Sequence, residues 1–154
     1  MGIKSFQGVR KTVKKEFEAP ILVADYMTKK LVTFKPNQSI LEVMELFTKH
    51  NISGGPVLDD NGFLVGIISE ADCMKQISES RYFNQPILNK SVENFMTRDV
   101  EFISPDISIF DAAGIFAKHN RRRLPVLKND ILVGQLSRKD VVVAALKLNG
   151  HNYK

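Results

Sequence analysis

The sequence predicts a mixed α/β fold of the α+β type, made of two β-α-β-β-α repeats that pack as a pseudo-twofold pair. Residues 23–58 align with residues 92–127 at a constant offset of 69, and 13 of the 36 columns are identical. When Gly62 is left out, the alignment continues through FLVGIISEAD (63–72) over ILVGQLSRKD (131–140) with five further identities. A repeat of about 50 residues is too short to bury a stable core alone. We therefore expect the two repeats to pack together, each covering the apolar helix faces of the other.

The first element of each repeat is a short strand. Residues 31–34 and 100–103 are β-prone runs, and Pro36 and Pro105 follow two residues later. Because proline has no N–H to donate to a ladder, each strand should end before it.

An amphipathic helix follows each strand. Ser39 precedes apolar residues at positions i, i+3, i+4 and i+7, and Glu42 is placed to complete a capping box. Ser108 precedes the corresponding helix of the second repeat, and both helices should end near a His-Asn pair, at 50–51 and 119–120. The expected apolar faces are Ile40, Val43, Met44 and Phe47 in the first repeat and Ile109, Ala112, Ala113 and Phe116 in the second.

A β-hairpin and a second helix complete each repeat. Residues 56–58 should pair with 63–68 across a DDNG turn, and residues 125–127 with 131–136 across a KND turn. The second helices should begin at Ser69 and Ser137. Their apolar residues are Cys73, Met74 and Ile77 in one copy and Val141, Val142, Ala145 and Leu146 in the other.

The chain divides into five predicted segments: a basic arm (1–20), the first repeat (21–78), a linker (79–90), the second repeat (91–148) and a tail (149–154). The arm carries five lysines and arginines against two glutamates, which is most of the formal net charge of +5. We interpret it as a solvated terminus.

Composition and motifs exclude several classes of protein. With one cysteine, no secretory segment and no run of 18 apolar residues, a cytoplasmic protein without disulfides is expected. No catalytic or metal-binding motif is visible, so neither an enzyme nor a metalloprotein is predicted. Aromatic residues make up only 8% and no nucleic-acid-binding motif is found, which argues against nucleic acid as a partner. We interpret Cys73 as a core thiol, and His50 and His119 as structural residues at helix ends.

The order of these motifs resembles the CBS (cystathionine beta-synthase) domain family over residues 23 to 147. The resemblance rests on Met-Thr before the first strand, a capped helix, a strand with an early proline (GGPVL, RLPVL) and a Gly-h-h-Ser-x-x-Asp segment, where h is apolar, except for Gln135 in the second copy. It implies a stand-alone tandem CBS pair with two clefts between the repeats. It also implies a regulatory, ligand-sensing module that binds an adenosyl nucleotide, such as AMP, ADP, ATP or S-adenosylmethionine, and forms a homodimer. No required cofactor is implied, and the regulated protein is not identified.

Two Ser-x-x-Asp motifs, Ser69/Asp72 and Ser137/Asp140, place a hydroxyl and a carboxylate on one face at a helix start. The carboxylate can accept hydrogen bonds from ribose hydroxyls, and the helix N-terminus attracts an anion. The same spacing is close to a capping box, which would explain both residues without a ligand. The resemblance favours ligand contact for at least one site, and the two roles are compatible.

The repeats differ just before the second strand, where three arginines (121–123) align with residues 52–54. In the family, basic residues at this place often reach phosphates, so the resemblance implies that role for Arg122 and Arg123 more than for Arg121. The alternative is a solvated basic loop. We expect Asp140 to share the arginine-bearing cleft.

Two further features complete the set of candidate residues. Gly54-Gly55 should permit a turn, or else should let the backbone approach an adenine ring. Ser104 stands where the family sometimes contacts ligand. The candidate ligand-binding residues are Ser69, Asp72, Gly55, Pro56, Ser104, Arg122, Arg123, Leu124, Pro125, Ser137 and Asp140. The predicted function is adenosyl-nucleotide sensing; the alternative is a ligand-free dimerising interaction scaffold.

Overall fold

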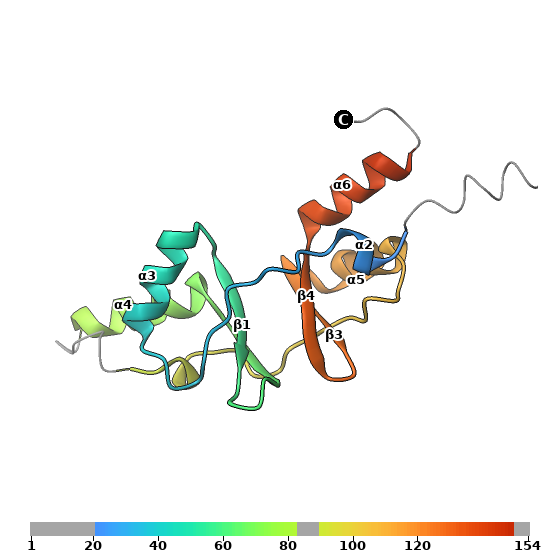
Figure 1. Cartoon of the computed structure of the whole chain (residues 1–154). Helices are drawn as coiled ribbons and strands as arrows, with labels where there is room; N and C mark the ends of the chain where they lie inside the picture. The colour runs from blue at the N-terminus through green and yellow to red at the C-terminus, as the bar shows by residue number, and fades with distance from the viewer. Residues whose placement is uncertain (1–20, 83–89, 150–154) are drawn as a thin grey trace, which may run out of the picture.

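Each repeat folds as an antiparallel hairpin with helices packed on it, as a computed structural model shows for residues 21–82 and 90–149 (Figure 1). The first hairpin pairs β1 (Gly54–Leu58) with β2 (Leu64–Ser69), and the second pairs β3 (Arg123–Lys128) with β4 (Ile131–Ser137). Their registers are equivalent, and each shifts at the same place, after Val57 and after Val126. The predicted hairpins and the duplicated mixed fold are therefore confirmed.

The helices that follow the first strands begin and end where the sequence predicts. Helix α3 is Ile40–His50 and α5 is Ile109–His119. The hydroxyl oxygens of Ser39 and Ser108 accept hydrogen bonds from backbone N–H groups three residues later, at 3.1 and 3.0 Å. Asn51 and Asn120 end the helices in the left-handed conformation, which asparagine tolerates better than most residues. The predicted capping box is wrong in one detail, because the Glu42 carboxylate accepts instead from Gln38 Nε2.

The predicted first strands are reduced to single bridges. Phe34 pairs with Val57 and Ile103 with Val126, both in parallel. The Phe34 N–H donates to the Pro56 carbonyl at 2.9 Å, and the Leu58 N–H donates to the Phe34 carbonyl at 2.8 Å. The pairing stops there because the proline two residues later has no N–H to continue it.

The second helices, α4 (Glu70–Tyr82) and α6 (Arg138–Leu148), begin where predicted but bury less than expected. Cys73 and Ala144 lie in the cores, whereas Met74 and Val142 have 55% and 57% of their surface exposed. The positions of Met74 and Val142 are therefore not covered by the other repeat, although the apolar pattern had predicted that they would be buried. No described helix is long and apolar enough to cross a membrane.

Two of the predicted segment boundaries meet described residues. Helix α4 continues to Tyr82, so residues 79–82 of the predicted linker are helical. The remainder of that linker up to residue 89, the basic arm (1–20) and residues 150–154 of the tail lie outside the described residues. The five-segment division remains a prediction.

Each core is completed by the first segment of the other repeat. Val23, in the short helix α2 (Val23–Tyr26), lies in the core of the second repeat, and Val92, in the 3₁₀ helix η2 (Val92–Asn94), lies in the core of the first. Backbone hydrogen bonds anchor both segments, from Val23 N–H to the Ile107 carbonyl and from Val92 N–H to the Gln38 carbonyl, each at 2.9 Å. The buried core residues are Phe34, Ile40, Val43, Phe47, Val57, Ile68, Cys73, Val92 and Met96 in one cluster, and Val23, Ile103, Ile109, Ala112, Phe116, Leu124, Val126, Leu136 and Ala144 in the other.

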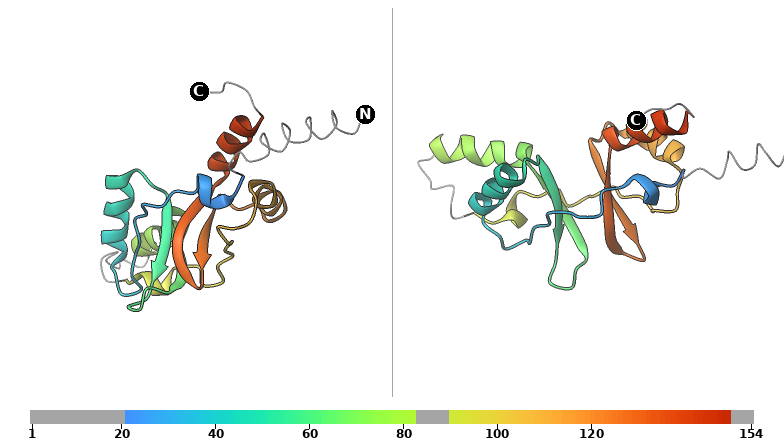
Figure 2. Two further views of the ribbon diagram at one scale, coloured as in Figure 1. Left: turned by 45° about the vertical axis from the view of Figure 1, so that its right-hand side comes forward. Right: turned by 45° about the horizontal axis from the view of Figure 1, so that its top comes forward.

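The two hairpins lie side by side at the centre of the molecule, with the helices on the outer sides (Figures 1 and 2). Thr28 and Gln135 exchange two backbone hydrogen bonds of 2.8 and 2.9 Å, and Thr97 and Ile67 exchange an equivalent pair. Gly66 permits this approach, because a Cβ there would stand 2.9 Å from the Thr97 carbonyl oxygen. The Met-Thr pairs that mark both repeats thus connect the start of each repeat to the hairpin of the other.

Candidate functional site

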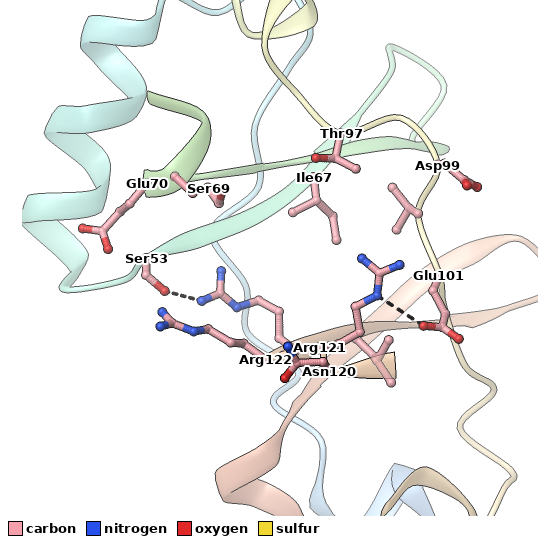
Figure 3. A pocket seen from close by; sticks show the side chains of 14 residues that line it. Ser53, Ile67, Ser69, Glu70, Thr97, Asp99, Glu101, Asn120, Arg121 and Arg122 are labelled. Atoms are coloured by element: carbon pink, nitrogen blue, oxygen red, sulfur yellow. Dashed lines mark hydrogen bonds and ion pairs between the residues drawn. The ribbon is translucent and has the colours of Figure 1, made fainter. Parts of the chain in front are cut away.

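Two cavities lie between the repeats. Cavity A has a volume of about 490 Å³ and is lined by Ser53, Ile67, Ser69, Glu70, Ala71, Thr97, Asp99, Val100, Glu101, Asn120, Arg121, Arg122, Arg123 and Leu124 (Figure 3). Cavity B has a volume of about 520 Å³ and is lined by Thr28, Lys30, Leu31, Val32, His50, Ile52, Gly54, Gly55, Pro56, Gln135, Ser137 and Asp140. Both volumes fall within the range of small-molecule sites, about 300–1,000 Å³.

The two cavities are related by the repeat. One wall of cavity A comes from the second repeat and consists of residues in the ranges 97–101 and 120–124. The other wall comes from the first repeat and consists mainly of residues at the junction of β2 and α4. Cavity B combines the corresponding segments in the opposite sense, so that Ser137 at the start of α6 faces β1. The expectation that Asp140 shares a cleft with the arginines is therefore wrong. Asp140 lines cavity B, and the helix start that faces the arginines is that of α4.

The Ser-x-x-Asp motifs form local hydrogen bonds at both helix starts. Asp140 Oδ2 accepts from the Ser137 N–H at 2.8 Å, and Ser137 Oγ accepts from the Asp140 N–H at 3.1 Å. Asp72 Oδ2 accepts from both the N–H and the hydroxyl of Ser69, at 2.8 and 2.9 Å. The capping interpretation is thus realised in both repeats. In each carboxylate Oδ1 accepts no hydrogen bond from a residue that the structure describes, so capping leaves one oxygen for a ligand.

The three arginines have different surroundings. Arg121 Nε lies 3.4 Å from Glu101 Oε1, and Glu101 also contacts His119 Nδ1. The Arg123 guanidinium crosses to the first repeat and donates a hydrogen bond to Ser53 Oγ (Figure 3). Burial is the main cause that lowers the pKa of Arg123, and the neighbouring Arg122 charge adds to it. Arg123 remains charged, because an arginine pKa of 12 or more leaves wide room for such a shift.

Gly54 and Gly55 do not form the expected turn. They are the first two residues of strand β1, and among the described glycines only Gly62 has a positive φ. Gly54 lacks the side chain that would collide with the Arg123 guanidinium, and a Cβ on Gly55 would stand 2.9 Å from Phe34 Cε2. The glycines therefore make space for neighbouring side chains.

The other candidate residues are divided between the walls and the interior. Arg122, Arg123, Leu124 and Ser69 line cavity A, and Gly55, Pro56, Ser137 and Asp140 line cavity B. Asp72, Ser104 and Pro125 line neither. Asp72 lies behind Ser69, Ser104 Oγ accepts from the Asp106 N–H in a turn, and Pro125 is buried with its carbonyl bonded to Ile103.

Sequence reasoning missed several residues of the walls. Thr28 and Thr97 occupy equivalent places in cavities B and A, and their identity in the repeat alignment was the available signal. Asp99 and Glu101 of cavity A gave no such signal, because the aligned residues in the first repeat are Lys30 and Val32.

The titratable residues singled out earlier do not form a reactive centre. Cys73 is buried, and burial, followed by Asp72 and then Glu70, raises its pKa to about 11. The prediction of a core thiol is confirmed. His50 lines cavity B at the end of α3, and His119 contacts Glu101 at the end of α5. In residues 21–82 and 90–149 no group of three or more His, Cys, Asp or Glu residues is arranged to hold a metal ion.

Comparison with known proteins agrees with this architecture. A family model described as the CBS domain matches residues 23–79 and 92–147. The uncharacterized protein MJ1426 of Methanocaldococcus jannaschii is 34% identical over 155 residues, which span 82% of this chain and 92% of that protein. The CBS domain-containing protein YhcV of Bacillus subtilis is 31% identical over 122 residues, which span 79% and 83%.

Two solved structures resemble this chain closely in fold. The crystal structure of CBSX2 in complex with AMP has a TM-score of 0.74 and 32% identity, and the match covers 84% of this chain and 99% of that one; CBSX2 comes from Arabidopsis thaliana. The CBS domain pair of protein MJ0100, in complex with 5'-methylthioadenosine and S-adenosyl-L-methionine, has a TM-score of 0.67 and 31% identity over 86% and 100% of the two chains.

Proposed function

Because this chain belongs to the CBS domain family, we propose that it is a regulatory module that senses an adenosyl nucleotide in the cavities between its two repeats. The proposal rests on one observation. Each cavity is lined by the start of a helix from one repeat and by the residues before the single parallel bridge of the other repeat. Related proteins at 32% and 31% identity have been crystallised with AMP and with methylthioadenosine and S-adenosylmethionine, which supports this ligand class.

The side chains in each cavity suit the parts of such a ligand. In cavity B, Leu31, Val32 and Ile52 offer apolar surface to an adenine ring, and Asp140 Oδ1 can accept from ribose hydroxyls. In cavity A, Ile67 and Val100 offer the apolar surface, and the arginines offer N–H donors to phosphate. There the Ser69 hydroxyl and the first N–H groups of α4 stand in the place that Ser137 has in cavity B.

A ligand in either cavity contacts both repeats. The ligand therefore stabilises the orientations of the two repeats in which both walls of the cavity contact it. It leaves the free energy of the other orientations unchanged. Only the difference in affinity between two orientations can act as a signal. Thr97 and Ile67, whose backbone hydrogen bonds connect the repeats, both line cavity A. They are therefore placed to respond when a ligand binds in that cavity.

The proposal is tested by thermal shift and titration calorimetry with AMP, ATP, S-adenosylmethionine and methylthioadenosine. At a hundredfold excess over Kd, a ligand that binds only the native state adds about 2.7 kcal/mol to the free energy of unfolding. We expect at least one of the four to raise the Tm. In the Asp140→Ala variant, cavity B should lose affinity and cavity A should keep it.

The control for that variant is Asp60→Ala, which removes the same charge from the exposed turn between β1 and β2. Asp140→Ala also removes a helix cap and so lowers the ligand-free stability by about 1 kcal/mol. For this reason the shift caused by ligand, rather than the Tm itself, is compared between variants. No shift and no heat with any of the four ligands at millimolar concentration would reject the proposal.

A second candidate function is a ligand-free interaction scaffold. It is favoured by one observation, the complete capping hydrogen bonds of Ser69/Asp72 and Ser137/Asp140, which need no ligand to explain them. It becomes the better account if the four ligands fail to bind.

We also propose that the chain forms a homodimer through α4 and α6. Met74 and Val142 are equivalent residues of the two repeats, and both are more than half exposed; Ile77 and Leu146 lie one turn further along. The double variant Met74→Glu/Val142→Glu should be monomeric in light scattering after size exclusion, with an unchanged circular dichroism spectrum. Phe110→Glu, an equally exposed site on α5, should remain dimeric. A monomeric wild-type chain at micromolar concentration would contradict the proposal.

A further inference from the structure

Cavity A carries equal numbers of opposite charges. Its lining includes the three arginines (121–123) and three carboxylates, Glu70, Asp99 and Glu101. The carboxylates come from both repeats, Glu70 from the first residue of α4 and the other two from the segment before Ile103. An anionic ligand therefore meets a wall with no net charge, although the sequence around the arginines suggested a cationic one.

The arginines are also unequally available. Arg121 is paired with Glu101 and Arg123 is bonded to Ser53. The Arg122 guanidinium has no hydrogen bond or ion pair with any residue that the structure describes, and it points to the side of the cavity where Ser53 and Glu70 lie (Figure 3). One guanidinium is thus ready to bind phosphate, and a bidentate arginine suits one phosphate group.

Cavity B shows that the carboxylates are particular to cavity A. The residues aligned with Asp99, Glu101 and Glu70 are Lys30, Val32 and Arg138. At all three positions the acidic residue of cavity A is replaced by a basic or apolar one. The local fold therefore does not require a carboxylate at these positions.

We propose that cavity A selects a nucleoside monophosphate over the corresponding di- and triphosphates, with Arg122 as the phosphate ligand and Glu70 and Asp99 as the residues that reject further phosphates. This inference rests on the proposed function and names the ligand class of one of its two sites. Like charges in a partly desolvated cavity repel strongly, and specificity often comes from such a repulsive element. A second or third phosphate gains only the Arg123 guanidinium, which already donates to Ser53 and interacts with the Glu70 charge. It also adds negative charge beside a wall that carries the Glu70 and Asp99 carboxylates.

The test is calorimetric titration with adenosine, AMP and ATP in buffer containing EDTA, in the Asp140→Ala background so that cavity A is measured. We expect AMP to bind at least tenfold more tightly than ATP. Arg122→Ala should weaken AMP binding at least tenfold and leave adenosine binding within twofold. Glu70→Gln/Asp99→Asn should reduce the preference for AMP over ATP at least fivefold.

Glu45→Gln is the matched control, since it removes one carboxylate from the exposed surface of α3 and should leave the preference unchanged. ATP binding as tightly as AMP, or a preference that the carboxylate variant does not alter, would overturn the inference while leaving the proposed function intact. Failure of adenosine, AMP and ATP to bind the wild-type chain would overturn the inference as well, and the proposed function would be rejected only if S-adenosylmethionine and methylthioadenosine also failed to bind. An excess of Mg²⁺ should reduce the preference for AMP over ATP in the wild-type cavity, because the ion neutralises part of the charge of the added phosphates. An unchanged preference would point to steric exclusion of ATP and would contradict the role of the carboxylates.

Discussion

Replacement of Phe34 by alanine is expected to lower the free energy of unfolding by about 3–5 kcal/mol, the usual range for a buried phenylalanine. Phe34 is 1% exposed and contacts the edge of Phe47, with ring centroids 5.5 Å apart and an interplanar angle of 85°. Its backbone forms the single parallel bridge to β1, and its ring lies beside Gly55, which lines cavity B. Because domains of this size have a total stability of about 5–15 kcal/mol, the variant should lose a large part of its stability.

Urea denaturation followed by circular dichroism measures this loss. Phe110→Ala is the matched control: the same substitution, in α5, at a side chain that is 62% exposed, should change stability by less than about 0.5 kcal/mol. Because each core contains the first segment of the other repeat, both variants should unfold in one transition rather than two. A loss below 1 kcal/mol for Phe34→Ala would show that the core of the first repeat is not packed as described.

Replacement of Gly66 by alanine is expected to destabilise the contact between β2 and the Met96-Thr97 segment of the other repeat by about 1–3 kcal/mol, the usual effect of overpacking. The new Cβ would stand 2.7 Å from Met96 Sδ and 2.9 Å from the Thr97 carbonyl oxygen. The thioether can rotate away, but the carbonyl is fixed by its hydrogen bond to Ile67. The Thr97–Ile67 pairing must therefore lengthen, and because both residues line cavity A, ligand affinity there should fall with stability.

Gly114→Ala distinguishes this effect from a general intolerance of the extra methyl group. Gly114 lies in α5 with nothing within 4 Å of the position of a Cβ, so alanine there should stabilise the chain by about 0.5–1 kcal/mol through helix propensity. Denaturation curves of the two variants, together with AMP titration of Gly66→Ala, measure both parts. Equal stability of the two variants would contradict the close approach of β2 and the Met96-Thr97 segment.

The elements that depend on local chemistry could be predicted closely. The Ser39 and Ser108 caps, the left-handed Asn51 and Asn120 ends and the hairpins follow from hydrogen bonds and conformations within a few residues. The first strands were overestimated, because β propensity cannot show that Phe34 and Ile103 find only one bridging partner each. The buried face of α6 was also misjudged, since Val142 is apolar but exposed and the smaller Ala144 is buried.

For the candidate site, most of the side chains could be predicted from the sequence, but which of them share a cavity could not. Ser69, Ser137, Asp140 and the arginines were predicted, and each of them lines a cavity. Their assignment to a shared cleft was wrong for Asp140, because residues of one repeat complete the cavity of the other. Asp99 and Glu101 went unnoticed, since a carboxylate in a loop has no signal in sequence until the fold places it beside an arginine.

The sequence by itself determined that this chain has two copies of one unit, where the helices and hairpins of each copy lie, and that two helix starts carry a hydroxyl and a carboxylate. Those properties depend on residues close together along the chain. Only the tertiary structure shows that the segment before Phe34 packs in the core of the second repeat and the segment before Ile103 in the core of the first. It also shows that each cavity is built from both repeats and that Arg123 occupies the space left by Gly54. These arrangements join residues about 70 positions apart, and they depend on side-chain volume and charge at a contact that no local pattern records.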